Sequence, residues 1–323
     1  MPPGTLRQWG WQGSSDLKSH GGREQTMLGH VNNTIITACV VLFLSVAAFA
    51  GERWSEKRAA EWYAPQSWLA GCNYTPRTAI NQLEFWQADT FDPKTIDQEL
   101  AWAQGIGFNV LRVYLHDIPY RQDAEGFCKR IDEFLSICDK HGIRAMFVLL
   151  DDCWDPSPKP GKQPEPRPHV HNSGWVQCPG NEITARLGLW AGDWSDPNKM
   201  SPINKISVEQ SDIVTFHCYD GMRNFQARAE AAMRYNRPTI CTEYLNRRSG
   251  CTFQAVMPYM KEKRIGAINW GFVAGKIQTQ YPWSSWHKTF TAEPPVWFHD
   301  ILRPDGKPFD PAETDLIRKL TGH

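Results

Sequence analysis

The sequence lacks an excess of charge of either sign, because 35 Lys and Arg residues stand against 35 Asp and Glu residues. This balance gives no electrostatic reason to expect nucleic acid or an anionic membrane surface as a partner. The sequence also lacks a phosphate-binding glycine loop, a serine-nucleophile elbow and an internal repeat. We therefore expect no nucleotide chemistry, no cofactor and no serine-hydrolase mechanism.

A zinc-ligand template is missing as well. Potential ligands do occur close together in the chain at Asp151, Asp152, Cys153, His169 and His171. Their spacing fits no zinc pattern. We interpret them as solvated loop residues and predict no metal.

The longest apolar stretch is too short to span a bilayer comfortably. It runs from Ile35 to Ala48 and ends in a small-x-small pattern, which is typical of a signal peptide. We predict an unstructured extension over 1–26, a signal peptide over 27–50 and a secreted or periplasmic mature protein over 51–323. An uncleaved signal anchor is the one membrane attachment that this stretch allows.

Eight of the nine cysteines follow this segment. An exported protein can form disulfides, but their connectivity cannot be read from spacing. Cys138, Cys218 and Cys241 fall in helix or strand patterns, so we expect them to be buried thiols.

Tryptophan is abundant, with 15 residues, and many of them lie in expected loops. Indole rings in loops suit flat, half-polar ligands such as sugars. The set that favours an extended saccharide groove is Trp154, Trp175, Trp194, Trp283 and Trp286.

Short apolar runs alternate with helical patterns along the chain, which predicts right-handed βαβ units and a parallel sheet. The expected strands cover residues 68–74, 108–115, 143–150, 187–191, 212–219, 238–244 and 265–271. These seven strands have the character of a TIM (β/α)8 barrel, which needs eight.

The strand over 238–244 carries Glu243 near its carboxyl end. In α/β barrels this end of the strands holds the chemistry. A buried lone carboxylate is costly, so Glu243 needs a partner or a function. One interpretation is a strand-end ion pair with Arg247 or Arg248, and the other is a catalytic carboxylate.

Several strand-end motifs together resemble the retaining glycoside hydrolases of the cellulase-like clan, family five and its relatives. They are Arg112, residues 216–219, residues 242–244 and residues 269–271. Four further motifs are similar to a bacterial secreted branch of that clan often labelled 1,4-β-xylanase, and they lie at residues 71–76, 171–175, 190–194 and 297–300. The resemblance covers about residues 60–320.

This resemblance implies a role for each matching residue. Glu243 would be the nucleophile, and Arg112 would orient it and lower its pKa. His217 and Tyr219 would line the same pocket, and Trp270 would be the stacking platform beneath the sugar. His116 also resembles a substrate-contacting residue, while Trp194 and Trp283 are expected to bind substrate as members of the set of loop tryptophans.

A retaining hydrolase needs a second carboxylate as general acid. In the clan this residue follows an asparagine at the end of the fourth strand, and here Asn181 and Glu182 form such a pair. No apolar strand precedes them, however, and the run at 187–190 begins too soon for a crossover. The sector around the fourth strand is therefore expected to be missing, with Glu182 either a chance match or the acid.

Three explanations remain open for the missing sector. They are an error in the gene model, which we favour, a natural form that no longer catalyses, and a rearranged loop that still brings Glu182 to Glu243. The predicted function is hydrolysis of β-linked polysaccharide or oligosaccharide with retention, by a monomer. The alternative is a non-catalytic carbohydrate-binding relative.

Overall fold

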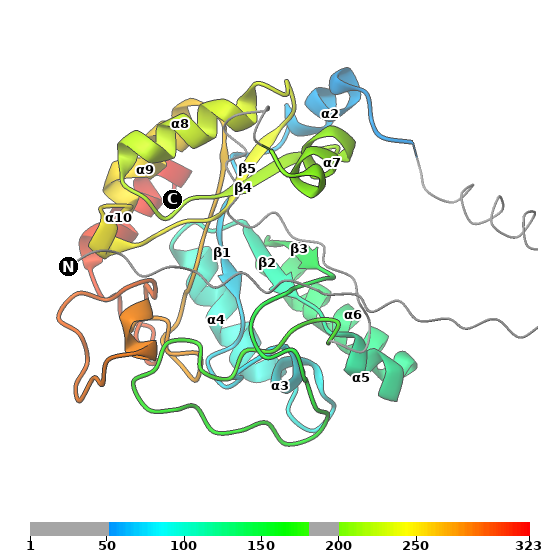
Figure 1. Ribbon diagram of the computed structural model, residues 1–323, viewed down its shortest axis with the longest axis vertical. Helices are drawn as coiled ribbons and strands as arrows, with labels where there is room; N and C mark the ends of the chain where they lie inside the picture. The colour runs from blue at the N-terminus through cyan, green and yellow to red at the C-terminus, as the bar shows by residue number, and fades with distance from the viewer. Residues whose placement is uncertain (1–51, 181–199) are drawn as a thin grey trace, which may run out of the picture. The chain divides into compact units, whose positions relative to one another are not determined.

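The computed structural model describes residues 52–180 and 200–323, which form an α/β fold around one parallel sheet (Figure 1). The six strands are β1 (Ala70–Tyr74), β2 (Val110–Tyr114), β3 (Arg144–Val148), β4 (Val214–His217), β5 (Thr239–Glu243) and β6 (Gly266–Asn269). Each lies within a predicted strand. The seventh predicted strand, 187–191, lies outside the described residues.

Among the described residues one helix precedes β1, and others follow most of the strands. They are α2 (Glu56–Tyr63), α3 (Gln82–Trp86), α4 (Pro93–Gly105), α5 (Asp117–Gln122), α6 (Ala124–Lys140), α7 (Pro202–Gln210), α8 (Met222–Met233), α9 (Phe253–Glu262) and α10 (Pro311–Thr321). The start of α4 shows how local sequence sets an element, because the Asp92 side chain accepts a hydrogen bond from the Thr95 amide at 3.0 Å. Pro93 then occupies the first turn, where no amide donor is needed.

The order of the strands identifies the architecture. It is β3-β2-β1-β6-β5-β4, so the first and last strands pair in the middle of the sheet. All five pairings are parallel. In a (β/α)8 barrel the same pairing of first and last strands closes the ring. The described chain is therefore an incomplete (β/α) barrel with β3 and β4 as its edges, which confirms the predicted fold class.

The open edge changes how well β3 is covered. Every residue of β1, β5 and β6 is buried, whereas every residue of β3 is at least partly exposed. Leu149, which follows β3, has 67% of its surface exposed. Neighbouring strands and helices would bury these positions in a closed barrel. Among the described residues no strand pairs with the free edge of β3, and apolar surface is left exposed there.

Two groups of helices cover the rest of the sheet (Figure 1). The helices α4 and α6 pack together near the β1 to β3 half, and α8, α9 and α10 lie along the β4 to β6 half. None of the described helices is long and apolar enough to cross a membrane. The eight cysteines in the described residues are all free thiols, and Cys138, Cys218 and Cys241 are buried as predicted.

The interpretation of Glu243 as a strand-end ion pair with Arg247 is wrong, because Glu243 pairs with Arg112 and contacts His217. Arg247 forms a bidentate ion pair with Glu313 of α10, in which Nε donates to Oε1 at 2.8 Å and Nη2 donates to Oε2 at 2.6 Å. Both side chains are buried, with 5% and 4% exposure. A partner 66 residues away could not be inferred from the local sequence.

We expect Glu313→Ala to destabilise the protein by about 3–5 kcal/mol, because it leaves the buried Arg247 guanidinium without a counter-charge. Urea unfolding at pH 7 measures this loss. The matched control is Asp315→Ala on the same helix, which breaks only an exposed pair with Arg318 and should cost less than about 1 kcal/mol. Equal losses in the two variants would contradict this account.

Candidate functional site

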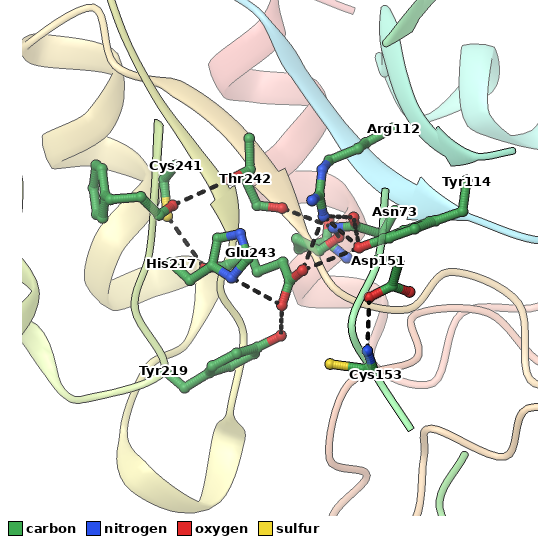
Figure 2. Close-up of polar contacts among 12 residues, drawn as sticks. Asn73, Arg112, Tyr114, Asp151, Cys153, His217, Tyr219, Cys241, Thr242 and Glu243 are labelled. Atoms are coloured by element: carbon green, nitrogen blue, oxygen red, sulfur yellow. Dashed lines mark hydrogen bonds and ion pairs between the residues drawn. The ribbon is translucent and has the colours of Figure 1, made fainter. Parts of the chain in front are cut away.

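The candidate site lies at the carboxyl ends of four strands, where one carboxylate collects donors from its neighbours (Figure 2). Glu243 is the last residue of β5 and is buried. In the parallel sheet, strand ends lie along one edge, so Asn73 of β1, Arg112 of β2 and His217 of β4 reach the same place. Register alone brings His217 opposite Glu243.

Each oxygen of Glu243 has its own partners. Oε1 accepts hydrogen bonds from Arg112 Nη1 at 2.9 Å and from the Tyr114 hydroxyl at 3.1 Å. Oε2 accepts one from the Tyr219 hydroxyl at 2.8 Å and lies 3.4 Å from His217 Nδ1. The carboxylate is therefore held at a fixed orientation from both sides.

Arg112 is itself held in place by Asn73. The Asn73 side-chain oxygen accepts from Arg112 Nη1 at 2.7 Å. Its amide nitrogen donates to the backbone oxygens of Thr242 and Asn269, at 2.8 Å and 3.0 Å. Asn73 thus connects β2, which carries the cation, to β5 and β6 on the other side of β1.

The charges around Glu243 decide its protonation. Burial alone would raise its pKa, but His217, Arg112 and the Tyr219 hydrogen bond outweigh burial, so the pKa lies below its usual value. Burial also lowers the pKa of His217, so this imidazole is neutral near pH 7. Arg112 is then the permanent counter-charge, and Glu243 is ionised across the neutral range.

The two tyrosines act as donors. Burial, with the neighbouring Glu243, raises the pKa values of Tyr114 and Tyr219 well above normal. Both phenols therefore keep their protons near neutral pH and direct them at the carboxylate.

A cavity of about 540 Å³ opens beside Glu243. Its aromatic lining consists of Trp154, Trp175, Trp270, Trp283 and Trp286 with Tyr114 and Tyr219. Trp270 is only partly buried, and its ring lies edge-on to Tyr114 and Trp175, each with a centroid distance of 6.0 Å. This packing fixes its orientation at the cavity wall. Such a wall suits the apolar face of a sugar ring.

The same cavity continues into the open side of the barrel. Met146, Phe147 and Val148 of β3 line it on one side, and Thr215 of β4 with Ser207 of α7 lines it on the other. The volume therefore includes space between the two sheet edges as well as the pocket around Glu243.

A second carboxyl group faces this cavity. Asp151 follows β3, and its Oδ2 accepts hydrogen bonds from Trp175 Nε1 at 2.7 Å and Gln82 Nε2 at 3.2 Å. Burial raises its pKa to about 6, and the negative charge of Glu243 acts in the same direction. Two carboxyl groups with opposite pKa shifts therefore line one cavity.

The predicted site residues divide into three groups. Those that line the cavity are Arg112, His217, Tyr219, Glu243, Trp270 and Trp283. His116 lies apart from it, since its Nδ1 accepts from the Ile118 amide at the start of α5 and its Nε2 faces the Gln177 backbone oxygen. Glu182 and Trp194 lie outside the described residues.

Three of the five potential metal ligands lie together, and the interpretation of all five as solvated loop residues is wrong, because His171 is buried and Asp151 is only partly exposed. Asp151, Asp152 and Cys153 offer donor atoms within 4.8 Å of one another. His169 and His171 point their Nδ1 atoms at the backbone oxygens of Phe290 and Tyr281 instead. A second group of donor atoms within 4.8 Å of one another belongs to His116, Asp117 and Cys178. Proximity alone does not establish an ion site, and we assign no metal.

Sequence reasoning missed three residues of this site, namely Asn73, Tyr114 and Asp151. Tyr114 had a readable signal, because it lies two residues after Arg112 on one strand and must share its face. Asn73 had a weaker one at the end of the first strand. The loop residue Asp151 had none, since its position depends on contacts with Trp175 and Gln82.

Similarity to known proteins is found in the fold and not in the sequence. No protein-family model and no curated protein matches the sequence. Among solved structures, the chain is similar to a glycoside hydrolase family 5 mannosidase from Rhizomucor miehei, at 13% identity over 78% of this chain and 92% of that one, with a TM-score of 0.41.

Two other similar structures are enzymes of bacterial origin. The endo-β-1,4-mannanase from Thermotoga petrophila is 12% identical over 80% of this chain and 77% of that one, with a TM-score of 0.44. A subfamily 18 member of glycoside hydrolase family 5 from Bifidobacterium longum is 14% identical over 80% of both chains, with a TM-score of 0.46. At this distance the likenesses bear on neither substrate nor activity.

We expect Arg112→Met to destabilise the protein at pH 7 by about 3–5 kcal/mol, since it leaves the buried Glu243 charge uncompensated. The lowered pKa of Glu243 means that its stabilising contribution exists above the unfolded-state pKa and is lost as the pH falls through the folded value. Losing Arg112 raises that folded pKa. The deficit of the variant should therefore shrink as the pH falls from the raised pKa of Glu243 in the variant toward its lowered pKa in the parent.

Urea unfolding from pH 3 to pH 7 tests this expectation. The double variant Arg112→Met/Glu243→Gln removes both charges and should recover part of the loss at pH 7. A deficit that is independent of pH would show that Arg112 acts by packing alone.

Proposed function

We propose that the protein is a retaining glycoside hydrolase that uses Glu243 as its nucleophile. The observation that supports this is an ionised, buried carboxylate held by Arg112, Tyr114 and Tyr219 in a tryptophan-lined cavity. Ordinary strand-end ion pairs need neither the two phenol donors nor the aromatic cavity.

Glu243 would attack the anomeric carbon and form a glycosyl-enzyme, which water then hydrolyses. The oxygen best suited for attack is Oε2, because Oε1 already accepts two hydrogen bonds within 3.1 Å. Tyr219 donates to Oε2 at 2.8 Å. This phenol would stabilise the carboxylate again when it leaves the sugar.

The substrate that we propose is a β-linked oligosaccharide or polysaccharide. Trp270 would lie against the sugar at the cleavage point, and Trp283, Trp286 and Trp154 would extend the stacking surface outward. Trp154 has half of its surface exposed, at 51%, as suits the outer end of a groove. Export remains a proposal that rests on residues 27–50, which lie outside the described residues.

Mechanism-based trapping tests the nucleophile. Incubation with 2,4-dinitrophenyl 2-deoxy-2-fluoro-β-glycosides of glucose, mannose and xylose should leave a stable sugar adduct, and peptide mass spectrometry should place it on Glu243. The Glu243→Gln variant should take up no label. It should also lose activity by on the order of 1,000-fold or more on the corresponding dinitrophenyl β-glycosides.

The matched control is Glu133→Gln, an exposed glutamate of α6, which should be labelled and turned over like the parent protein. If no dinitrophenyl glycoside is hydrolysed and no adduct forms, yet oligosaccharides bind, the protein is the non-catalytic carbohydrate-binding relative. An adduct on another residue would overturn the assignment of Glu243.

A further inference from the structure

The described residues contain a candidate for the proton donor that a retaining mechanism requires. Besides Glu243, the carboxyl groups that line the cavity belong to Asp151 and Asp152. Asp152 is exposed, whereas Asp151 lies under Trp175 and Gln82. Figure 2 shows Asp151 beside Tyr114, on the side of Glu243 away from Tyr219.

The position of Asp151 is fixed on several sides. Its backbone forms a two-way bridge with Cys178, amide to oxygen at 2.6 Å and 2.8 Å, which ties the loop after β3 to the segment that carries Trp175. Oδ2 accepts from both Trp175 and Gln82. Oδ1 accepts from the Cys153 amide, at 3.2 Å, and the Cys153 thiol also donates a hydrogen bond to this carboxyl group. Because Oδ2 already accepts two side-chain hydrogen bonds, we take Oδ1 as the oxygen that carries the proton.

The surroundings of Asp151 raise the pKa of its carboxyl group, so that the protonated form is well populated up to about pH 6. Burial and the negative charge of Glu243 raise its pKa to about 6, while Trp175, Cys153 and Arg112 act in the opposite direction. The adjacent Cys153 thiol is neutral, because burial and nearby carboxylates raise its pKa. Of the two carboxyl groups, Glu243 is the charged partner and Asp151 the proton carrier, the division of labour that acid and base catalysis needs.

We propose that Asp151 is the general acid and base of this site, a role that rests on the proposed glycosidase function. It would take the place of the carboxylate that family resemblance puts at the end of a fourth barrel strand. Among the described strands β3 is an edge strand, and the cavity extends along it to Asp151, beyond its carboxyl end. A carboxyl group at this end can approach the cavity from the β3 side.

The proposed reaction has two steps, and Asp151 gives up its proton in the first and regains it in the second. As Glu243 forms its bond to the anomeric carbon, the bond from that carbon to the leaving oxygen breaks, and Asp151 Oδ1 gives its proton to that oxygen. Asp151 is then a carboxylate. It takes a proton from water, the water oxygen bonds to the anomeric carbon, and the bond to Glu243 breaks. Both residues end in their starting states.

Three variants separate the candidates, namely Asp151→Asn, Glu182→Gln and the control Asp155→Asn. Asp155 is exposed in the same loop and contacts the Ser157 amide outside the cavity. Each is assayed with 2,4-dinitrophenyl and 4-methylphenyl β-glycosides of the sugar that the parent protein hydrolyses fastest. The first leaving group needs little acid assistance, and the second needs much.

For Asp151→Asn we expect kcat/KM on the 4-methylphenyl glycoside to fall by about 100-fold or more, and on the dinitrophenyl glycoside by less than about 10-fold. Added azide should accelerate dinitrophenyl turnover and give the β-glycosyl azide. The basic limb of the pH profile, near pH 6 in the parent, should disappear. Asp155→Asn should behave as the parent does.

The same pattern in Glu182→Gln, with Asp151→Asn unaffected, would overturn the proposal and assign the acid to Glu182. An equal loss on both substrates without azide rescue would also overturn it. Failure of the glycosidase function itself would give a different result from failure of the Asp151 role. In that case the parent turns over neither glycoside, and no adduct forms on Glu243.

A measurement without any substitution at position 151 guards against misfolding. Carboxyl carbon NMR of the 13C-aspartate-labelled parent should show two aspartates that titrate near pH 6, since burial raises the pKa values of both Asp151 and Asp300 to about 6. Only the titration of the Asp151 signal should move lower in Glu243→Gln. Its signal is identified by its loss in Asp151→Asn, and thermal unfolding of that variant within a few degrees of the parent confirms the fold. Titration of Asp151 below pH 5 in the parent would contradict the assignment.

Discussion

One buried negative charge organises this end of the sheet. A carboxylate taken out of water costs several kcal/mol unless it is paired and hydrogen-bonded. Glu243 meets this requirement with Arg112 and Tyr114 from β2 and Tyr219 from beyond β4, and Asn73 of β1 holds Arg112 in position. Compensating one charge therefore draws together residues from four of the six strands.

The requirement also explains which parts of the site were readable from the sequence. The cluster formed by Glu243, Arg112, His217 and Tyr219 lies at strand ends, and strand ends in a parallel sheet meet by construction. Short apolar runs that alternate with helical patterns likewise predicted all six described strands. Asp151 and the Arg247 to Glu313 pair depend on how long loops fold back. Nothing in local periodicity encodes such contacts.

The open edge of the sheet has two consequences for the site. It leaves β3 partly exposed, and the strand that carries Asp151 at its end pairs on one side only among the described strands. Its position depends instead on the backbone bridge to Cys178 and on the contact with Trp175. The proposed acid is thus supported by a loop, whereas the nucleophile is supported by the most buried part of the sheet.

The pairing of β1 with β6 also bears on how the chain folds. The strands β1, β2 and β3 follow one another along the chain, and so do β4, β5 and β6. Each set of three can therefore pair from nearby segments. The pairing of β1 with β6 instead joins segments that are far apart in the sequence. Trp68 and Ile265, for example, are separated by 197 residues and linked by a 2.7 Å hydrogen bond. Closing so long a loop has an entropic cost and slows folding. Asn73 and Arg112 lie on the β1 to β3 side of this pairing, and Glu243 lies on the β4 to β6 side. The site is therefore completed only when β1 pairs with β6.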